Sequence, residues 1–160
     1  MPEDAFTVHP IGIVRSSIKQ PADDCWSGLI SVIELDPQLF TAESTAGLSD
    51  FSHAEIVFVF DRVPVAAIQT GARHPRDRRD WPRVGIFAQR GKARPNRIAT
   101  TICRIENVEA LRISVREFDA IDGTPVLDIK PYMQEFAPRE PVRQPAWSCE
   151  LMAGSFKPPK

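Results

Sequence analysis

The sequence predicts a mainly β fold: about six or seven short strands with short helices, closed into a β-barrel or curled into one strongly bent sheet. Short runs of apolar or alternating residues are separated by turn-forming residues, which is the pattern of an all-β domain. Fifteen prolines favour many short elements, since proline breaks helices and is kept out of central strands. The 160 residues are about one domain's length.

The predicted strands cover residues 6–15, 29–35, 54–60, 84–89, 100–106, 111–118 and 126–129. Gly12 marks a bulge or bend in the first strand. The third is almost entirely apolar, which suits a strand buried on both faces. The fifth and sixth form a hairpin, joined around residues 107–110. Between the second and third, Asp36 as N-cap and Pro37 at the first helical position predict a short helical turn, with helical pieces up to residue 48.

Two segments lack such patterning. Residues 63–82 carry several arginines and prolines without any period, and long loops of this kind are usually functional or disordered. Beyond residue 136 the chain is rich in proline, and we expect much of it to be mobile, with Trp147 and Leu151 as anchors. We therefore expect a barrel domain over residues 1–136 and a proline-rich tail over residues 137–160.

The net charge of −1 hides a strong asymmetry. Residues 73–97 contain nine basic and two acidic residues, a charge of +7, whereas the rest contains eleven basic and nineteen acidic residues, a charge of −8. A basic segment on an acidic body is typical of a local contact with a polyanion. The alternative is a solvated basic turn, but the added arginines of the preceding loop favour capture of phosphate or carboxylate groups.

Cysteines and histidines are sparse. The three cysteines, Cys25, Cys103 and Cys149, contain no C-x-x-C pair, and no secretory segment is present, so we expect buried free thiols in a reducing cytoplasm. The scattered histidines predict no metal site. The strongest apolar run, residues 56–60, is too short to span a membrane, and no membrane contact is expected. Sequence fingerprints of Rossmann cofactor sites, P-loops and zinc proteases are missing.

Two segments, GIFAQRGKARPNRI at 85–98 and DGTPVLDIKPY at 122–132, combine charges, turns and prolines beyond what core strands need. Asp128 and Lys130 would share one face of a strand, either as a structural ion pair or as a functional pair. Asp61 ends a predicted buried strand, where a carboxylate often lines a site, or else caps the next turn. Trp26 and Trp81 are either ordinary core or rim aromatics or stacking surfaces for a base.

These segments resemble the TsaA-like family, which includes tRNA N6-threonylcarbamoyladenosine methyltransferases. The family patterns are approximately G-V-F-A-T-R-S-P-x-R-P-N-P-I-G and D-x-x-D-G-T-P-V-x-D-I-K-P-Y. Residues 85–88, 90, 94–96 and 98 match the first pattern, and residues 119, 122–126 and 128–132 match the second. The segments IGIVRS at 11–16, and GL at 47–48 with FSH at 51–53, are similar to two further family motifs. The resemblance spans residues 6–136.

The resemblance implies a single-sheet β-barrel, S-adenosylmethionine as methyl donor, and a site completed across a homodimer. The methyl acceptor would be N6 of threonylcarbamoyladenosine beside the anticodon of tRNA. The implied cofactor contacts are Phe60, Asp61, Arg90, Ile102, Ile121, Asp122, Gly123 and Thr124. The RNA contacts that we assign to the basic segment and the second motif are Arg73, Arg76, Arg78, Arg79, Lys92, Arg94, Asn96, Arg97, Lys130 and Tyr132. Our candidates for accepting the proton from the weakly nucleophilic nitrogen are Asp122 and Asp128.

The chain also departs from the family pattern. Its Gln89, Gly91 and Lys92 replace Thr, Ser and Pro, Arg97 and Ala99 replace Pro and Gly, and Asp23-Asp-Cys-Trp26 stands where the family has P-R-Q. One cofactor contact is therefore supplied differently or lost. Two alternatives stay open: a methyltransferase of the same fold with another acceptor, and an RNA-binding module without catalysis that uses residues 73–97.

Overall fold

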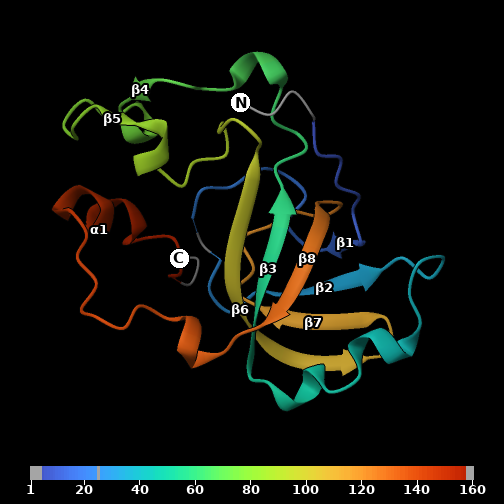
Figure 1. The fold of residues 1–160 in the computed structure, drawn as a ribbon. Helices are drawn as coiled ribbons and strands as arrows, with labels where there is room; N and C mark the ends of the chain where they lie inside the picture. Colours follow the sequence, from blue (N-terminus) through green and yellow to red (C-terminus); the bar gives the residue numbers. More distant parts are fainter. Residues whose placement is uncertain (1–4, 25, 158–160) are drawn as a thin grey trace.

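The computed structural model describes residues 5–24 and 26–157, and within them six antiparallel strands close into a barrel in the order β1-β2-β7-β6-β3-β8 (Figure 1). The barrel strands are β1 (Gly12–Arg15), β2 (Ile30–Leu35), β3 (His53–Val59), β6 (Ile98–Glu109), β7 (Arg112–Arg116) and β8 (Pro125–Pro131). A separate two-stranded sheet pairs β4 (Ala72–Arg73) with β5 (Val84–Gly85). The predicted β-barrel is confirmed.

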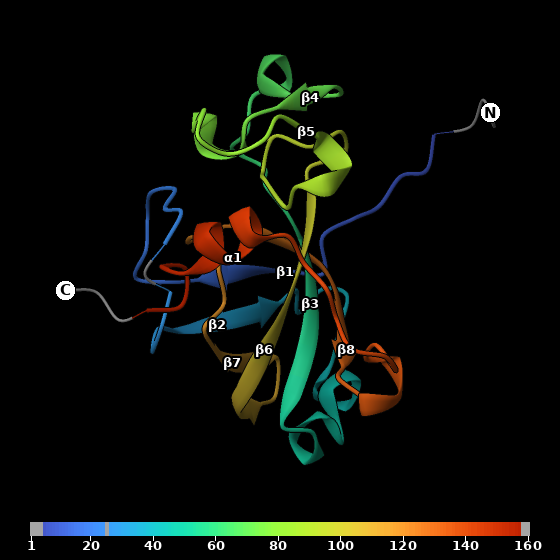
Figure 2. The same cartoon turned by 90° about the vertical axis from the view of Figure 1, so that its left-hand side faces the viewer.

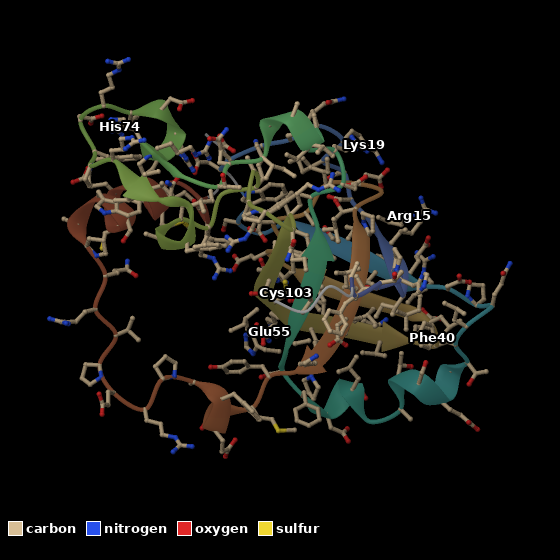
Figure 3. The ribbon with its side chains drawn as sticks, turned by 45° about the horizontal axis from the view of Figure 1, so that its top comes forward. Arg15, Lys19, Phe40, Glu55, His74 and Cys103 are labelled. Carbon is tan, nitrogen blue, oxygen red and sulfur yellow. The ribbon has the colours of Figure 1, made fainter. Side chains whose placement is uncertain are left out.

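Alternation along the strands creates the core. In β3, Ala54, Ile56 and Phe58 are fully buried, whereas the residues between them are half-buried. The prediction that this strand is buried on both faces was wrong, because a barrel encloses only one face of each strand. Phe58 packs edge-on against Phe60 and Phe118, with ring centroids 5.4 and 5.1 Å apart. Cys103, also buried, faces the same interior (Figure 3).

A close approach of β1 to β2 and a register shift in β8 shape the sheet. Gly12 approaches β2 so closely that an added Cβ would lie 2.3 Å from the carbonyl oxygen of Glu34, so glycine is required there. In β8 a register shift pairs Val126 with Phe58 but Asp128 with Val57. This bulge turns Asp128 to the outer face of the barrel, because directly paired residues share a face.

Several strands begin or end at other residues than predicted. The first strand begins at Gly12 rather than Phe6, whose side chain is 88% exposed. The predicted strand 84–89 is β5 followed by a 3-10 turn, η5 (Ile86–Ala88), so its apolar residues do not continue a sheet. The hairpin of β6 and β7 is confirmed, but β6 runs on to Glu109 and the turn begins at Ala110, whose φ is 49°.

Between β2 and β3 the chain forms short helical pieces, as predicted. Asp36 opens a turn in which its carboxylate accepts a hydrogen bond from the Gln38 amide at 2.9 Å. Two 3-10 helices, η1 (Ala42–Thr45) and η2 (Leu48–Asp50), then lead into β3. Two more, η3 (Val65–Ala67) and η4 (Pro75–Asp77), interrupt the basic loop.

The carboxyl-terminal segment contains two short helical elements, and the expectation that much of it is mobile stays a prediction. After η6 (Gln134–Phe136) it runs along the outside of the molecule to a short helix, α1 (Ala146–Met152), which lies below the β4–β5 lobe (Figures 1 and 2). The Trp81 indole N–H donates to the Glu150 carboxylate at 2.7 Å. Trp147 and Leu151 are half-buried in this region. Residues 158–160 of the predicted tail lie outside the described residues.

The described cysteines are free thiols: Cys103 is buried, as predicted, but Cys149 is exposed, because the short helix that carries it turns that residue toward solvent. Cys25 lies outside the described residues. Within residues 5–24 and 26–157 there is no helix of the length and apolarity that crossing a membrane requires.

Candidate functional site

A pocket of about 250 Å³ opens at one end of the barrel, where β3 ends and the loop before β8 begins. Four predicted cofactor contacts line it: Phe60, Asp61, Ile121 and Thr124. Lys92, predicted to contact RNA, also lines it. The other lining residues are Pro21, Ala22, Trp26, Phe58, Arg62, Val63, Pro64, Ala67, Ala93, Asp119 and Ala120. Four segments far apart in sequence, near residues 21–26, 58–67, 92–93 and 119–124, thus form a single pocket.

The walls of this pocket are largely apolar. Phe58 and Trp26 are buried, and Phe60 is half-buried against the core. Trp26, which the sequence left as either a core aromatic or a stacking surface, is both buried and part of the lining. An apolar pocket with aromatic walls and a few convergent polar groups is typical of a small-molecule site.

Asp119 is the most buried carboxylate of the pocket. Loss of hydration on burial raises the pKa of Asp119, although the hydrogen bond from the Thr101 hydroxyl and the positive charge of Arg90 oppose this shift. Arg90 itself donates to the Thr100 carbonyl on β6. Asp119 lies within the second motif, but we assigned it no role from the sequence. Its partial desolvation marks it as a functional-site candidate.

Asp122 is held differently. Its carboxylate accepts hydrogen bonds from the Ser16 amide at 3.0 Å and from the Lys19 ammonium at 2.9 Å. Both contacts lower the pKa of Asp122, and the contact with Lys19 has the larger effect. The next residue, Gly123, has a φ of 82°, which glycine tolerates best. Arg62 donates to the main-chain carbonyls of Asp122 and Lys19 at 2.9 and 2.8 Å. This turn therefore holds three loops together around the pocket.

Several predicted site residues do not line this pocket: Arg90, Ile102, Asp122, Gly123 and Asp128. Ile102 lies on the outer face of β6 and is 50% exposed. Asp128 forms an ion pair with Lys130 on the outer face of β8, as the same-face prediction requires, and also accepts from the Ile129 amide at 2.9 Å. Of the four carboxylates discussed, Asp61 and Asp119 face the pocket.

The basic segment forms a lobe beside the pocket, and many of its cations are already engaged. Arg94 donates to the Gln89 carbonyl at 3.0 Å, and Arg97 to the Val63 carbonyl at 2.9 Å. Arg78 pairs with Asp80 and stacks over Trp81, 3.9 Å from the ring centroid. Trp81 is thus a covered rim aromatic rather than an open stacking surface.

Arg79 and Arg83, by contrast, are exposed and border a second, open hollow together with His74 and Asp77 (Figure 3 shows His74 in this lobe). Neither arginine has a salt-bridge partner in the described part of the chain. Across the same residues, no group of three or more His, Cys, Asp or Glu side chains is arranged to hold a metal ion.

Comparison with known proteins decides the family. Residues 17–138 match the model of the tRNA-methyltransferase O N-terminal domain. The chain belongs to this family. The TsaA-like resemblance is confirmed, and the matched residues include five of the six barrel strands, β2 to β8, with the pocket and the basic lobe.

Relatives agree with this assignment. A "probable S-adenosyl-L-methionine-binding protein" of Pyrococcus abyssi is 32% identical over 84% of this chain and 72% of its own length. The Escherichia coli "tRNA (adenine(37)-N6)-methyltransferase" is 32% identical, covering 81% of this chain and 58% of that protein. A crystal structure of TrmO from P. aeruginosa, 28% identical, superposes with a TM-score of 0.73 over 91% of this chain and 63% of its own. The chain thus spans less than two thirds of the latter two proteins.

Two residues that differ from the family pattern, Gln89 and Lys92, make specific contacts in the structure. The side-chain amide of Gln89, which replaces Thr, is buried and donates to the carbonyls of Val84 and Arg73 at 3.0 and 3.3 Å. Lys92, which replaces Pro, pairs with Asp23 at 3.3 Å. Asp23 itself belongs to the segment that replaces P-R-Q. Two departures therefore contact each other across the rim of the pocket.

Proposed function

We propose that this chain transfers a methyl group from S-adenosylmethionine to N6 of threonylcarbamoyladenosine beside the anticodon of tRNA. The single observation that carries the proposal is the aromatic, two-carboxylate pocket that adjoins a basic lobe in a member of this methyltransferase family. Relatives named as S-adenosylmethionine-binding proteins and as tRNA (adenine(37)-N6)-methyltransferases support the cofactor and the class of substrate.

The pocket residues fit the chemical groups of S-adenosylmethionine. Trp26 and Phe60 offer aromatic surface for the adenine ring. Asp61 and Asp119 offer negative charge toward the sulfonium and the ammonium, and Lys92 offers a cation for the carboxylate. The cofactor supplies an electrophilic methyl group on a positively charged sulfur.

Methylation of N6 would release the N6 proton, and a carboxylate of this chain would accept it. Asp119 is placed for that proton, because it lines the pocket and burial raises its pKa toward the range useful in general base catalysis. The assignment of this role to Asp122 or Asp128 stays a prediction. Both carboxylates are engaged in ion pairs outside the pocket lining.

The homodimer and a cytoplasmic location belong to the same proposal. Ile102 is half-exposed on the outer face of β6, so it would contact a cofactor only in the pocket of a second copy. Light scattering of Ile102→Glu should then show monomers, whereas Ile30→Glu on β2, 52% exposed, should leave the dimer intact. The free thiol of the exposed Cys149 suits a reducing compartment.

The test is transfer of labelled methyl from S-adenosylmethionine to tRNA that carries threonylcarbamoyladenosine, compared with the same tRNA without that modification. Label in the first alone supports the proposal. Binding of S-adenosylhomocysteine without label in either RNA points to another acceptor. Binding of RNA without binding of S-adenosylhomocysteine points to the non-catalytic module.

A further inference from the structure

One wall of the pocket is a loop with little regular structure of its own. Residues 16–29 connect β1 to β2, and within them Pro21, Ala22 and Trp26 line the pocket. A loop placed this way holds a ligand well only if other contacts fix its position, since mobile walls must be ordered when the ligand binds. The contacts that fix it come from two distant segments.

Asp24 is the centre of these contacts. Its two carboxylate oxygens accept hydrogen bonds from both terminal nitrogens of Arg76 in η4, at 2.8 and 2.9 Å. A third hydrogen bond from Arg76 reaches the Asp23 carbonyl at 3.0 Å. The Ser155 hydroxyl donates to the same carboxylate at 3.2 Å. The two-point geometry is the strong form of an arginine–carboxylate contact.

Ser155 also holds the wall directly. It follows α1, is 4% exposed, and accepts a hydrogen bond on its carbonyl from the Trp26 amide at 2.9 Å. Trp26 is itself 4% exposed and lines the pocket. The basic lobe, the carboxyl-terminal segment and the pocket wall therefore meet at one cluster, made of Asp24, Arg76, Trp26 and Ser155.

The backbone conformation of Arg76 also indicates that its side chain is held against the pocket wall. Arg76 and Asp77 have φ values of 49° and 55°, a left-handed conformation that is unfavourable for residues other than glycine. Such a conformation persists where surrounding contacts over-determine it. The hydrogen bonds of Arg76 to Asp23 and Asp24 are contacts of that kind, and they leave its guanidinium facing the wall rather than a free phosphate.

We propose that Asp24 and Arg76 are positioning residues for the cofactor pocket, and that the segment around Ser155 helps to hold the same wall in place. The inference rests on the proposed function for the identity of the ligand. It reassigns Arg76, which the sequence placed among the RNA contacts. It also gives a role to Asp24, in the segment that stands where the family has P-R-Q.

The test uses Asp24→Asn, Arg76→Ala and Arg76→Lys, with Asp80→Asn as the matched control, because the Arg78–Asp80 pair lies in the same lobe but does not touch the wall. Hydrogen exchange of the Trp26 amide is measured without ligand, and S-adenosylhomocysteine affinity by calorimetry. We expect faster exchange and an affinity about tenfold weaker for Asp24→Asn and Arg76→Ala, a smaller effect for Arg76→Lys, and none for Asp80→Asn. The charge-reversed pair Asp24→Arg with Arg76→Asp should recover part of the affinity.

RNA affinity separates positioning from RNA contact. Positioning predicts that Asp24→Asn and Arg76→Ala leave RNA affinity unchanged. If Arg76→Ala weakens RNA binding while Asp24→Asn strengthens it, Arg76 contacts RNA and the proposal is overturned. Unchanged Trp26 exchange in both variants also overturns it. A wild-type protein that binds no S-adenosylhomocysteine contradicts the proposed function instead, and the exchange measurement then decides the positioning role by itself.

Discussion

Asp119 and Asp122 lie three residues apart, yet their carboxylates have opposite surroundings. Burial raises the pKa of Asp119, whereas Lys19 and the Ser16 amide lower the pKa of Asp122. Burial disfavours the ionised form of a carboxylate and so weakens the folded state. Hydrogen-bonding and charged partners stabilise the ionised form and so strengthen the folded state. We therefore propose a functional role for Asp119 and a structural role in the turn for Asp122.

Asp119→Asn is expected to retain or raise stability while it weakens ligand binding. Because burial raises the folded-state pKa of Asp119, stability is lost as the pH rises from the ordinary aspartate value through that raised pKa, and Asn removes this penalty. The thermal midpoint at pH 7 should rise by about 2–4 °C, the shift that one kcal/mol gives in a domain of this size. The gain should vanish in acid, where the wild-type carboxyl is protonated in both states. A lower midpoint at pH 7 would show that Asp119 is chiefly structural.

Asp122→Asn is expected to behave in the opposite way. The lowered pKa of Asp122 contributes stability that is fully present above the ordinary aspartate value of about 3.9 and is lost as pH falls through the folded-state pKa. The variant should melt below wild type at pH 7, and the two midpoints should converge in acid. Midpoints that differ equally at both pH values would rule out the ion pair as the cause.

Among the elements, the strands were the most predictable from sequence and the contacts between loops the least. The runs of apolar residues in β2, β3 and β7 indicate strands because each needs one buried face. The helix α1 is only seven residues long, and what holds it is Trp81, 69 residues away in sequence from Glu150. No local pattern indicates such a contact.

The site follows the same division. Phe60, Asp61, Ile121 and Thr124, which the family resemblance predicted as cofactor contacts, all line one pocket. The family motifs predicted them because they include the loops that form this pocket. The Asp24–Arg76 pair joins residues 52 positions apart in segments where this chain has no matching motif. Only the folded arrangement of three loops reveals it.

The aromatic centre of the barrel is expected to contribute strongly to stability. Phe58 is fully buried and packs edge-on against Phe60 and Phe118, so Phe58→Ala should lower the unfolding free energy by about 3–5 kcal/mol in chemical denaturation. Phe87→Ala is the matched control, since Phe87 is 81% exposed on η5 and its loss should change the unfolding free energy by about 0.5 kcal/mol or less. Equal effects of the two substitutions would contradict this core.

At the scale of the whole molecule, charge is divided between an acidic body and a basic lobe. In Figure 1 the lobe and α1 lie on the same side of the barrel. Ion pairs within the molecule neutralise part of the +7 segment, as for Arg76 with Asp24 and Lys92 with Asp23. Arg79 and Arg83 are therefore the cations most open to phosphates.

The double variant Arg79→Ala with Arg83→Ala is expected to weaken tRNA binding and to reduce its dependence on salt. Each lost phosphate contact should lower the slope of log affinity against log salt by about 1. Filter binding across a salt series measures both quantities. The control is Arg112→Ala, which removes an arginine already paired with Glu34. If the control changes the slope as much as the double variant does, the RNA surface extends over the barrel.

The most direct measurement is calorimetric titration of S-adenosylhomocysteine into the wild type and two tryptophan variants of η3. Ala67 lines the pocket and Ala66 does not, although both side chains are exposed. We predict that the wild type and Ala66→Trp bind alike and that Ala67→Trp, which fills the pocket, binds at least about tenfold more weakly. Binding that is absent from the wild type, or equal in all three proteins, would contradict the assignment of this pocket to the cofactor.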